Sequence, residues 1–200
     1  MTGLRPMLRD DAGASAAEFA LVLPLLLLFL FGIIDAGRFM WEYNQAEKAT
    51  QMGVRYAVAT DPVLAGLDTY SFAVDGGIVA GQPIPTASFS EAECTSATCS
   101  CTGAACSSLG HDPDAFANIR RRMTAMYSPI GDENVIIEYR NVGLGYAGDP
   151  NGPDVAPLVT VRLTDLNFQP LTTMIFGTDM EMPDFRAALT LEDGSGSVAN

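Results

Sequence analysis

The sequence predicts an α+β protein in which a long amino-terminal helix, apolar and then amphipathic, packs against a small antiparallel sheet. The first observation is a run of sixteen residues without charge, from Phe19 to Ile34. The second is the spacing of apolar residues from Asp35 to Thr60, which recur at steps of three and four, as in a helix. The third is a set of short β-branched segments after residue 133. A helix that buries one face against a sheet satisfies all three.

The long helix is expected to run from about Ser15 to about Thr60. No proline lies between Pro24 and Pro62, and the second of these follows an aspartate, which makes a natural stop. At 1.5 Å per residue, this helix would be roughly 70 Å long. That length is more than one membrane crossing needs.

Residues 14–36 are predicted to span a membrane, because about 20 apolar residues cross a hydrocarbon core. Residues 37–61 would emerge as an amphipathic helix that covers the sheet through Phe39, Tyr43, Met52 and Tyr56. Arg5 and Arg9 precede the span, and basic residues near a span tend to stay cytoplasmic. We therefore expect a single-pass protein of the inner (cytoplasmic) membrane with a cytoplasmic amino terminus. Residues 62–192 would form the extracytoplasmic domain.

The charge distribution narrows the function. Residues 1–61 carry five basic and seven acidic groups, a net charge of −2, while residues 62–200 carry six and seventeen, a net charge of −11. Such an acidic domain repels nucleic acid, so no nucleic-acid partner is expected. The sequence holds a single histidine, His111, and no nucleophile motif. No catalytic residue, cofactor or metal site is predicted, and the protein is expected not to be an enzyme.

The amino-terminal stretch resembles the TadE-like family of pseudopilins in tight-adherence (Tad/Flp) pilus systems. The residues that carry the resemblance are G-A-S-A-A-E-F-A-L-V-L-P-L-L-L from Gly13, then G-I-I-D-A-G-R-F and Q-A-E-K-A-T-Q-M-G-V-R-Y-A. The resemblance implies a pilin-like fold and a leader, residues 1–13, that a prepilin peptidase removes between Gly13 and Ala14 on the cytoplasmic face. It also implies other pseudopilins and a major pilin as partners.

The chemistry of this stretch agrees with such processing. A glycine at the scissile position leaves the backbone accessible. A glutamate near the end of an apolar helix, here Glu18, is costly in lipid unless it is paired. After cleavage, the new amino group of Ala14 would be a nearby cation, within one chain or between neighbours. The alternative for Glu18 is a carboxylate solvated by lipid head groups.

Two functions from different classes follow. The first is a minor pilin or pseudopilin whose membrane helix packs with others to assemble a Tad (type IVc) pilus. The second is an extracytoplasmic binding or adhesion domain on an uncut membrane anchor. An ordinary secretory signal peptide is a weaker alternative, because the apolar run is long and the nearest small-x-small site is Ile34-Asp35-Ala36.

Four cysteines follow within residues 94–106, in a segment of Ser, Thr, Ala and Gly. Their spacing is C-x4-C-x-C-x4-C, and in an oxidising compartment it indicates disulfides. Structural zinc sites favour C-x2–4-C pairs, which this spacing fits poorly. A bridge between Cys99 and Cys101 is geometrically awkward. Two pairings therefore stay open: Cys94–Cys101 with Cys99–Cys106, or Cys94–Cys99 with Cys101–Cys106.

The rest of the domain is predicted from local patterns. Asp112 and Pro113 indicate the start of a helix that runs to about Tyr127, with an arginine triplet turned mostly to water. Strands are expected at three places, and a helical turn in one apolar stretch. The strands are 134–140, 158–168 and 185–191, and the turn is 171–176.

Loops make up the remainder. Residues 63–90 are expected to be loop with one or two short strands, around 71–74 and 77–80. Asp149, Asn151 and Asp154 could gather a calcium ion, but the full D-x-D-x-D-G-x5-E pattern is absent and turn chemistry is favoured. Residues 193–200 are expected to be a disordered tail.

Overall fold

A computed structural model describes residues 12–173, 177, 179–191 and 196. The predicted leader, residues 1–13, and the predicted tail, residues 193–200, lie almost wholly outside the described residues. The chain divides into two compact units. The first consists of Met1–Trp41 and Phe168–Met180, and the second of Glu42–Asn167 and Glu181–Asn200.

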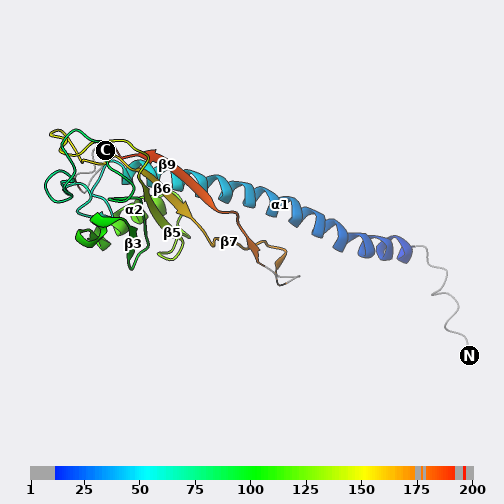
Figure 1. The fold of residues 1–200 in the computed structure, drawn as a ribbon. Helices are drawn as coiled ribbons and strands as arrows, with labels where there is room; N and C mark the ends of the chain where they lie inside the picture. Colours follow the sequence, from blue (N-terminus) through cyan, green and yellow to red (C-terminus); the bar gives the residue numbers. More distant parts are fainter. Residues whose placement is uncertain (1–11, 174–176, 178, 192–195, 197–200) are drawn as a thin grey trace, which may run out of the picture. The chain divides into compact units, whose positions relative to one another are not determined.

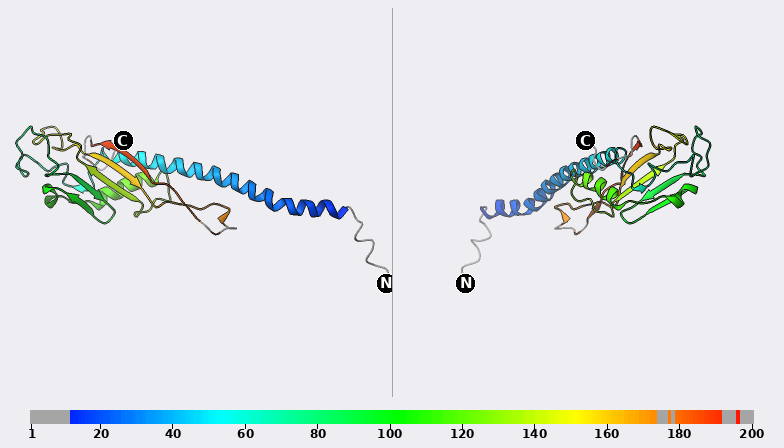
Figure 2. Two further views of the ribbon diagram at one scale, coloured as in Figure 1. Left: turned by 45° about the vertical axis from the view of Figure 1, so that its right-hand side comes forward. Right: turned by 90° about the vertical axis from the view of Figure 1, so that its left-hand side faces the viewer.

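Helix α1, Ala12–Ala57, runs through both units. The prediction of one long helix is confirmed, with each end about three residues from its expected position. Pro24 lies inside it without ending it, although proline removes one backbone donor from the helix ladder. The two views of Figure 2 show α1, drawn in blue to cyan, as one continuous coil.

The second unit is built on a five-stranded antiparallel sheet with strand order β3-β2-β5-β6-β9 (Figure 1). Its central pairs are in register at Cys94 with Ile137 and at Val161 with Ala187. The predicted strands at 134–140 and 185–191 are confirmed. The strands are β2 (Glu91–Cys94), β3 (Cys99–Thr102), β5 (Val135–Arg140), β6 (Leu158–Leu163) and β9 (Phe185–Thr190).

The second half of α1 packs closely against the apolar face of this sheet. A Cβ placed on Gly53 would lie 2.8 Å from the Met123 side chain and 3.4 Å from Val161 Cγ1. The large residues predicted to make the contact are only half-buried, although the Tyr43 ring meets Phe185 edge-on with centroids 4.9 Å apart. Several of the buried positions are small, which lets helix and sheet approach: Ala46, Ala49, Gly53 and Ala57.

Helix α2, Pro113–Thr124, confirms the predicted start. The Asp112 carboxylate accepts hydrogen bonds from the backbone N–H groups of Asp114, at 2.8 Å, and Ala115, at 3.0 Å, which satisfies donors that a helix start leaves open. Met123 and its apolar neighbours one and two turns back are buried. Of the arginine triplet, Arg120 pairs with Asp132 and the other two are exposed.

Two strand predictions were wrong. The strand expected at 158–168 ends at Leu163 and resumes only as β7, Asn167–Phe168. Asp165 between them has a φ of 56°, and the Asn134 side chain donates hydrogen bonds to the carbonyls of Thr164 and Asp165, so the chain turns there. The segments 71–74 and 77–80 form turns and loop instead of strands.

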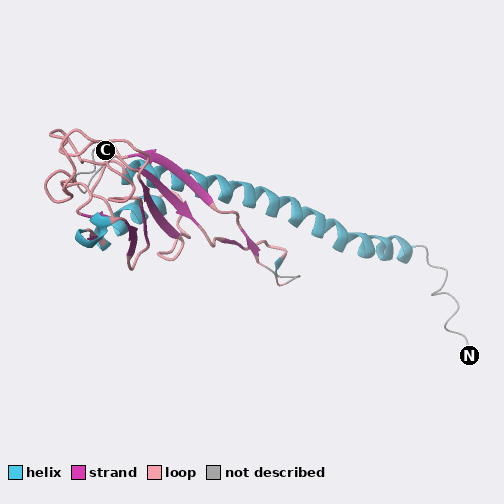
Figure 3. Ribbon diagram, in the orientation of Figure 1, coloured by secondary structure: helices cyan, strands magenta, loops and turns pink. Residues whose placement is uncertain are grey.

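Other elements were not predicted from the sequence. They are the local β2–β3 hairpin, the ribbon of β7 with β8 (Met180–Glu181), and the pair of β1 (Leu64–Ala65) with β4 (Gly110–His111), of which the last joins segments far apart in the sequence. Figure 3 draws the strands in magenta. A short 3-10 helix, η2, covers Ala104–Ser108.

Candidate functional site

The processing residues predicted from the sequence lie at the start of α1. Because the helix begins at Ala12, the Gly13–Ala14 peptide falls within its first turn. Glu18 is exposed one turn further on. Residues four apart share a helix face, so Glu18 and Ala14 lie on the same face, about 6 Å apart along the axis.

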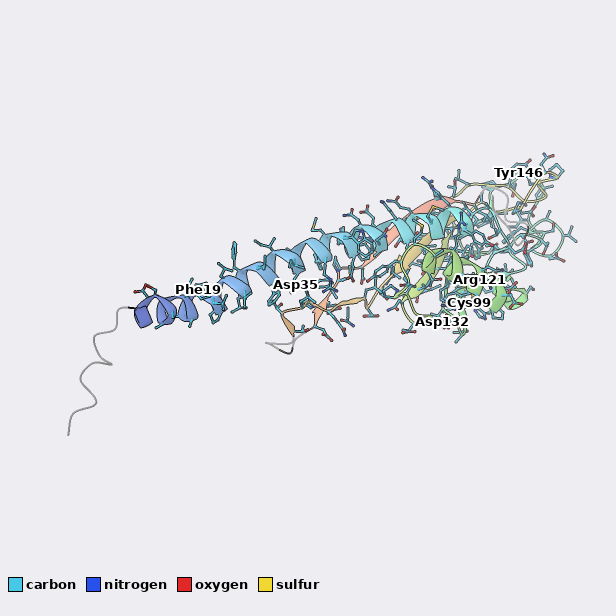
Figure 4. The ribbon with its side chains drawn as sticks, turned by 180° about the vertical axis from the view of Figure 1, so that it is seen from behind. Phe19, Asp35, Cys99, Arg121, Asp132 and Tyr146 are labelled. Atoms are coloured by element: carbon cyan, nitrogen blue, oxygen red, sulfur yellow. A yellow bond between two sulfur atoms is a disulfide. The ribbon has the colours of Figure 1, made fainter. Side chains whose placement is uncertain are left out.

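The helix beyond Glu18 is long and apolar enough to cross a membrane, by length and composition, and that stretch is not buried within the described structure. Its large apolar side chains, such as Leu21, Leu25 and Phe29, are exposed. Figure 4 shows Phe19 near the start of α1, and this side chain is 65% exposed. A continuous apolar surface of this kind requires lipid or other apolar helices around it.

Asp35, at the far end of the apolar run, is only 7% exposed. Its carboxylate accepts hydrogen bonds from the backbone N–H groups of Leu171, at 2.6 Å, and Thr172, at 2.9 Å, and from the Thr172 hydroxyl, at 2.9 Å. The Arg38 guanidinium lies 3.6 Å from the same carboxylate. The charge of Asp35 is therefore fully engaged within the first unit.

Arg38 and Phe39 extend this contact. Arg38 Nη1 donates to the Gln169 carbonyl at 3.3 Å, and its guanidinium carbon lies 5.3 Å from the centre of the Phe168 ring. The Phe39 ring meets Phe168 edge-on, with centroids 5.4 Å apart. We call this set of contacts, between Asp35, Arg38 and Phe39 on α1 and residues 168–172, the Asp35 clasp. Figure 4 labels Asp35 on α1, further along the helix than Phe19.

The clasp joins a local contact to a distant one. Asp35 and Arg38 are three residues apart on a helix and pair there. The contribution of Leu171 and Thr172 was missed, because 136 and 137 residues separate them from Asp35. The available signal was the cost of a carboxylate at the end of an apolar helix, which demands donors from elsewhere in the chain.

Helix α1 is similar to a known protein family. Residues 13–55 match the family model described as TadE-like protein. The chain carries a TadE-like segment. The resemblance seen in the sequence is thereby confirmed, and the matched residues cover nearly all of α1. No curated protein and no solved structure matches the chain, so the likeness to this family rests on this segment.

In the second unit, the four cysteines form two disulfides, Cys94–Cys99 and Cys101–Cys106. This is one of the two pairings left open by the sequence. Cys94 and Cys99 face each other in the register of the β2–β3 hairpin, so the first bridge closes the hairpin. The second ties β3 to η2.

The residues considered for calcium have other partners. The Asp154 carboxylate accepts hydrogen bonds from Phe72 N, at 2.6 Å, and Asp149 N, at 3.0 Å, while Asn151 N donates to Asp149 at 2.9 Å. These contacts are hydrogen bonds from backbone N–H groups to carboxylates, which is the turn chemistry that the sequence favours. Within the described ranges, no group of three or more His, Cys, Asp or Glu side chains is placed to hold a metal ion.

The sheet face opposite α1 is polar. Glu138 and Arg162 pair across neighbouring strands at 2.5 Å, and Arg162 faces Arg186 on β9. Open grooves of about 420 and 530 Å³ run over this face. Their charged lining residues are Glu91, Glu93, Glu138, Arg140, Arg162, Asp184 and Arg186.

Proposed function

We propose that this TadE-like protein is a minor pilin or pseudopilin that takes part in assembling a Tad pilus by packing its apolar helix with the helices of other subunits. The observation that carries the proposal is that the TadE-like match lies on one helix with two environments. Its first half exposes a continuous apolar surface, and its second half packs into the core of the second unit. A helix of this kind joins an assembly contact directly to a folded domain.

The proposal includes processing by a prepilin peptidase between Gly13 and Ala14. Terminal helical turns fray, so the scissile peptide can be presented to a peptidase without disturbing the rest of α1. Cleavage places a new ammonium group at Ala14, one turn before Glu18 and on the same face. Glu18 then pairs with the amino group of its own chain or of a neighbour, which removes the cost of its charge in the membrane.

The protein acts through packing alone and is not an enzyme. Its partners are the peptidase, other pseudopilins and a major pilin. Arg5 and Arg9 before the span support an amino terminus on the cytoplasmic side of the inner membrane. The disulfides support an oxidising location for the second unit.

The test is the amino-terminal sequence of the protein purified from its host membrane, combined with piliation of variants. We expect a terminus at Ala14, and loss of pili in Gly13→Leu and in Glu18→Gln. Glu47→Gln is the matched control, because it removes an exposed carboxylate further along the same helix. It should leave piliation unchanged.

Other outcomes would point elsewhere. A terminus at Met1 or Thr2 would indicate an uncut anchor and favour a tethered binding or adhesion domain. A terminus just after Ala36 would indicate a secretory signal peptide. Normal piliation in both the Gly13 and Glu18 variants would contradict the assembly role.

A further inference from the structure

The depth of Asp35 in a membrane can be worked out from α1. The uncharged run from Phe19 to Ile34 is sixteen residues, or about 24 Å of helix, whereas a hydrocarbon core is about 30 Å thick. With Glu18 at one boundary, Asp35 therefore falls within the far edge of the core. Trp41, which is 63% exposed, lies about 9 Å further along the axis, where tryptophan occupies the head-group layer.

The Asp35 clasp brings a second piece of chain to this depth. Leu171 and Thr172 donate directly to the Asp35 carboxylate, so they lie at the level of Asp35 along the helix. Leu171 is 42% exposed even though it is a large apolar residue. The sequence from Leu171 to Gly177 contains no charged residue.

Lipid requires that the polar groups of irregular backbone are satisfied internally, and the donors of the turn meet this condition. The N–H groups of Leu171 and Thr172 go to Asp35, and that of Thr173 goes to the Pro170 carbonyl at 3.1 Å. Pro170 has no N–H. Both threonine hydroxyls are bonded as well, one to Asp35 and the other to the Pro170 carbonyl at 2.6 Å.

We propose that the turn Pro170–Thr173 is a second membrane contact, which enters the far edge of the hydrocarbon core beside α1 and is held there by Asp35. Its occupant is lipid, because the turn continues the exposed apolar surface of the helix and leaves no N–H or hydroxyl of residues 170–173 unbonded. The inference requires α1 to lie in a bilayer. It does not require a pilus.

The test measures the depth of a tryptophan at the turn. Trp41 is the single tryptophan of the chain, so Trp41→Phe provides a silent background into which Leu171→Trp is introduced. Leu171 contributes only its backbone N–H to the clasp, and the substitution retains it. The full chain is reconstituted in phosphatidylcholine vesicles that carry bromine either near the head groups or near the chain ends.

We expect the Leu171→Trp fluorescence to be quenched, and more strongly by the shallow bromines than by the deep ones. In the same background, Leu25→Trp should be quenched most by the deep bromines, and Val74→Trp, exposed in the second unit, should not be quenched. Quenching at Leu25 with none at Leu171 would overturn the inference while leaving the membrane helix intact. An unquenched Leu25→Trp would overturn both.

Two further measurements identify what holds the turn and what covers it. Adding Asp35→Ala should abolish most of the quenching at Leu171→Trp, because the substitution removes the carboxylate that accepts three hydrogen bonds from the turn. Undiminished quenching would contradict the role given to Asp35. Diluting the protein in lipid should leave the quenching unchanged. If quenching by lipid instead appears only on dilution, a second copy of the chain covers the turn and the lipid assignment is wrong.

Discussion

Asp154 offers a quantitative test of how the loops of the second unit are held. The residue is 6% exposed, and its two carboxylate oxygens accept one backbone N–H each. One donor belongs to Phe72, which is fully buried, and the other to Asp149, which is partly exposed. Asp154→Ala removes both acceptors at once and leaves the Phe72 donor without access to water.

The expected loss can be worked out donor by donor. A buried N–H left without an acceptor costs about 2–3 kcal/mol, while a donor that water can reach costs about 1 kcal/mol. Asp154→Ala should therefore lower the free energy of unfolding by about 3–4 kcal/mol. The matched control is Asp149→Ala, whose carboxylate accepts from the exposed Asn151 N–H, and it should cost about 0.5–1 kcal/mol.

The measurement is urea unfolding of the full chain in detergent, followed by near-ultraviolet circular dichroism. An Asp154→Ala variant within about 1 kcal/mol of the parent would refute the argument, because a loss that small matches a single solvated donor. An excess of Ca²⁺ should leave the unfolding midpoint of the parent unchanged. A midpoint that rises with Ca²⁺ in the parent but not in Asp154→Ala would identify the loop as a cation site instead of a clamp.

Three further predictions concern the same unit. The double variant C94S/C99S should contain no free thiol in a thiol titration, and its free energy of unfolding should fall by about 2 kcal/mol. The double variant C94S/C101S should contain two free thiols. The reverse thiol counts would establish the other pairing. Gly53→Leu should cost about 3 kcal/mol in urea unfolding, because even a Cβ there meets a buried side chain at 2.8 Å, and parental stability would show that the helix can move off the sheet. Burial raises the pKa of Tyr139, so its hydroxyl ionises at a lower pH in the unfolded state than in the folded state. The free energy of unfolding should therefore fall above about pH 10, by up to about 1.4 kcal/mol per pH unit. In Tyr139→Phe this alkaline fall should be shallower, and an identical slope would exclude Tyr139 as a source.

The elements that sequence reasoning predicted correctly are those encoded by nearby residues. The cap of α2 requires only Asp112 and the first residues that follow it, and the buried face of that helix repeats at steps of three and four. Strand β5 alternates buried and less buried residues along six positions. The long helix was predictable for the same reason, since a lack of prolines and a regular apolar pattern are both local properties.

The elements that were missed depend on distant partners. A continuous alternating pattern extends past Leu163, but the Asn134 side chain binds the carbonyls of Thr164 and Asp165 and bends the chain there. Strand β2 gains its place from β5, more than forty residues later. Small polar residues fill the Cys-rich segment and have weak strand preference, and the pairing of β3 with β2 overrides that preference.

The two carboxylates that flank the apolar run show how far a sequence can specify a site. Glu18 and Asp35 are seventeen residues apart, about 26 Å of helix, and each would be costly at a membrane boundary if it were unpaired. At Asp35 the cost of the charge is offset within the chain, because three donors from Leu171 and Thr172 bind the carboxylate. At Glu18, which is exposed, the proposed answer is chemical, because cleavage after Gly13 creates a cation one turn away. The same electrostatic demand is thus met by tertiary structure at one end of the helix and, we propose, by processing at the other.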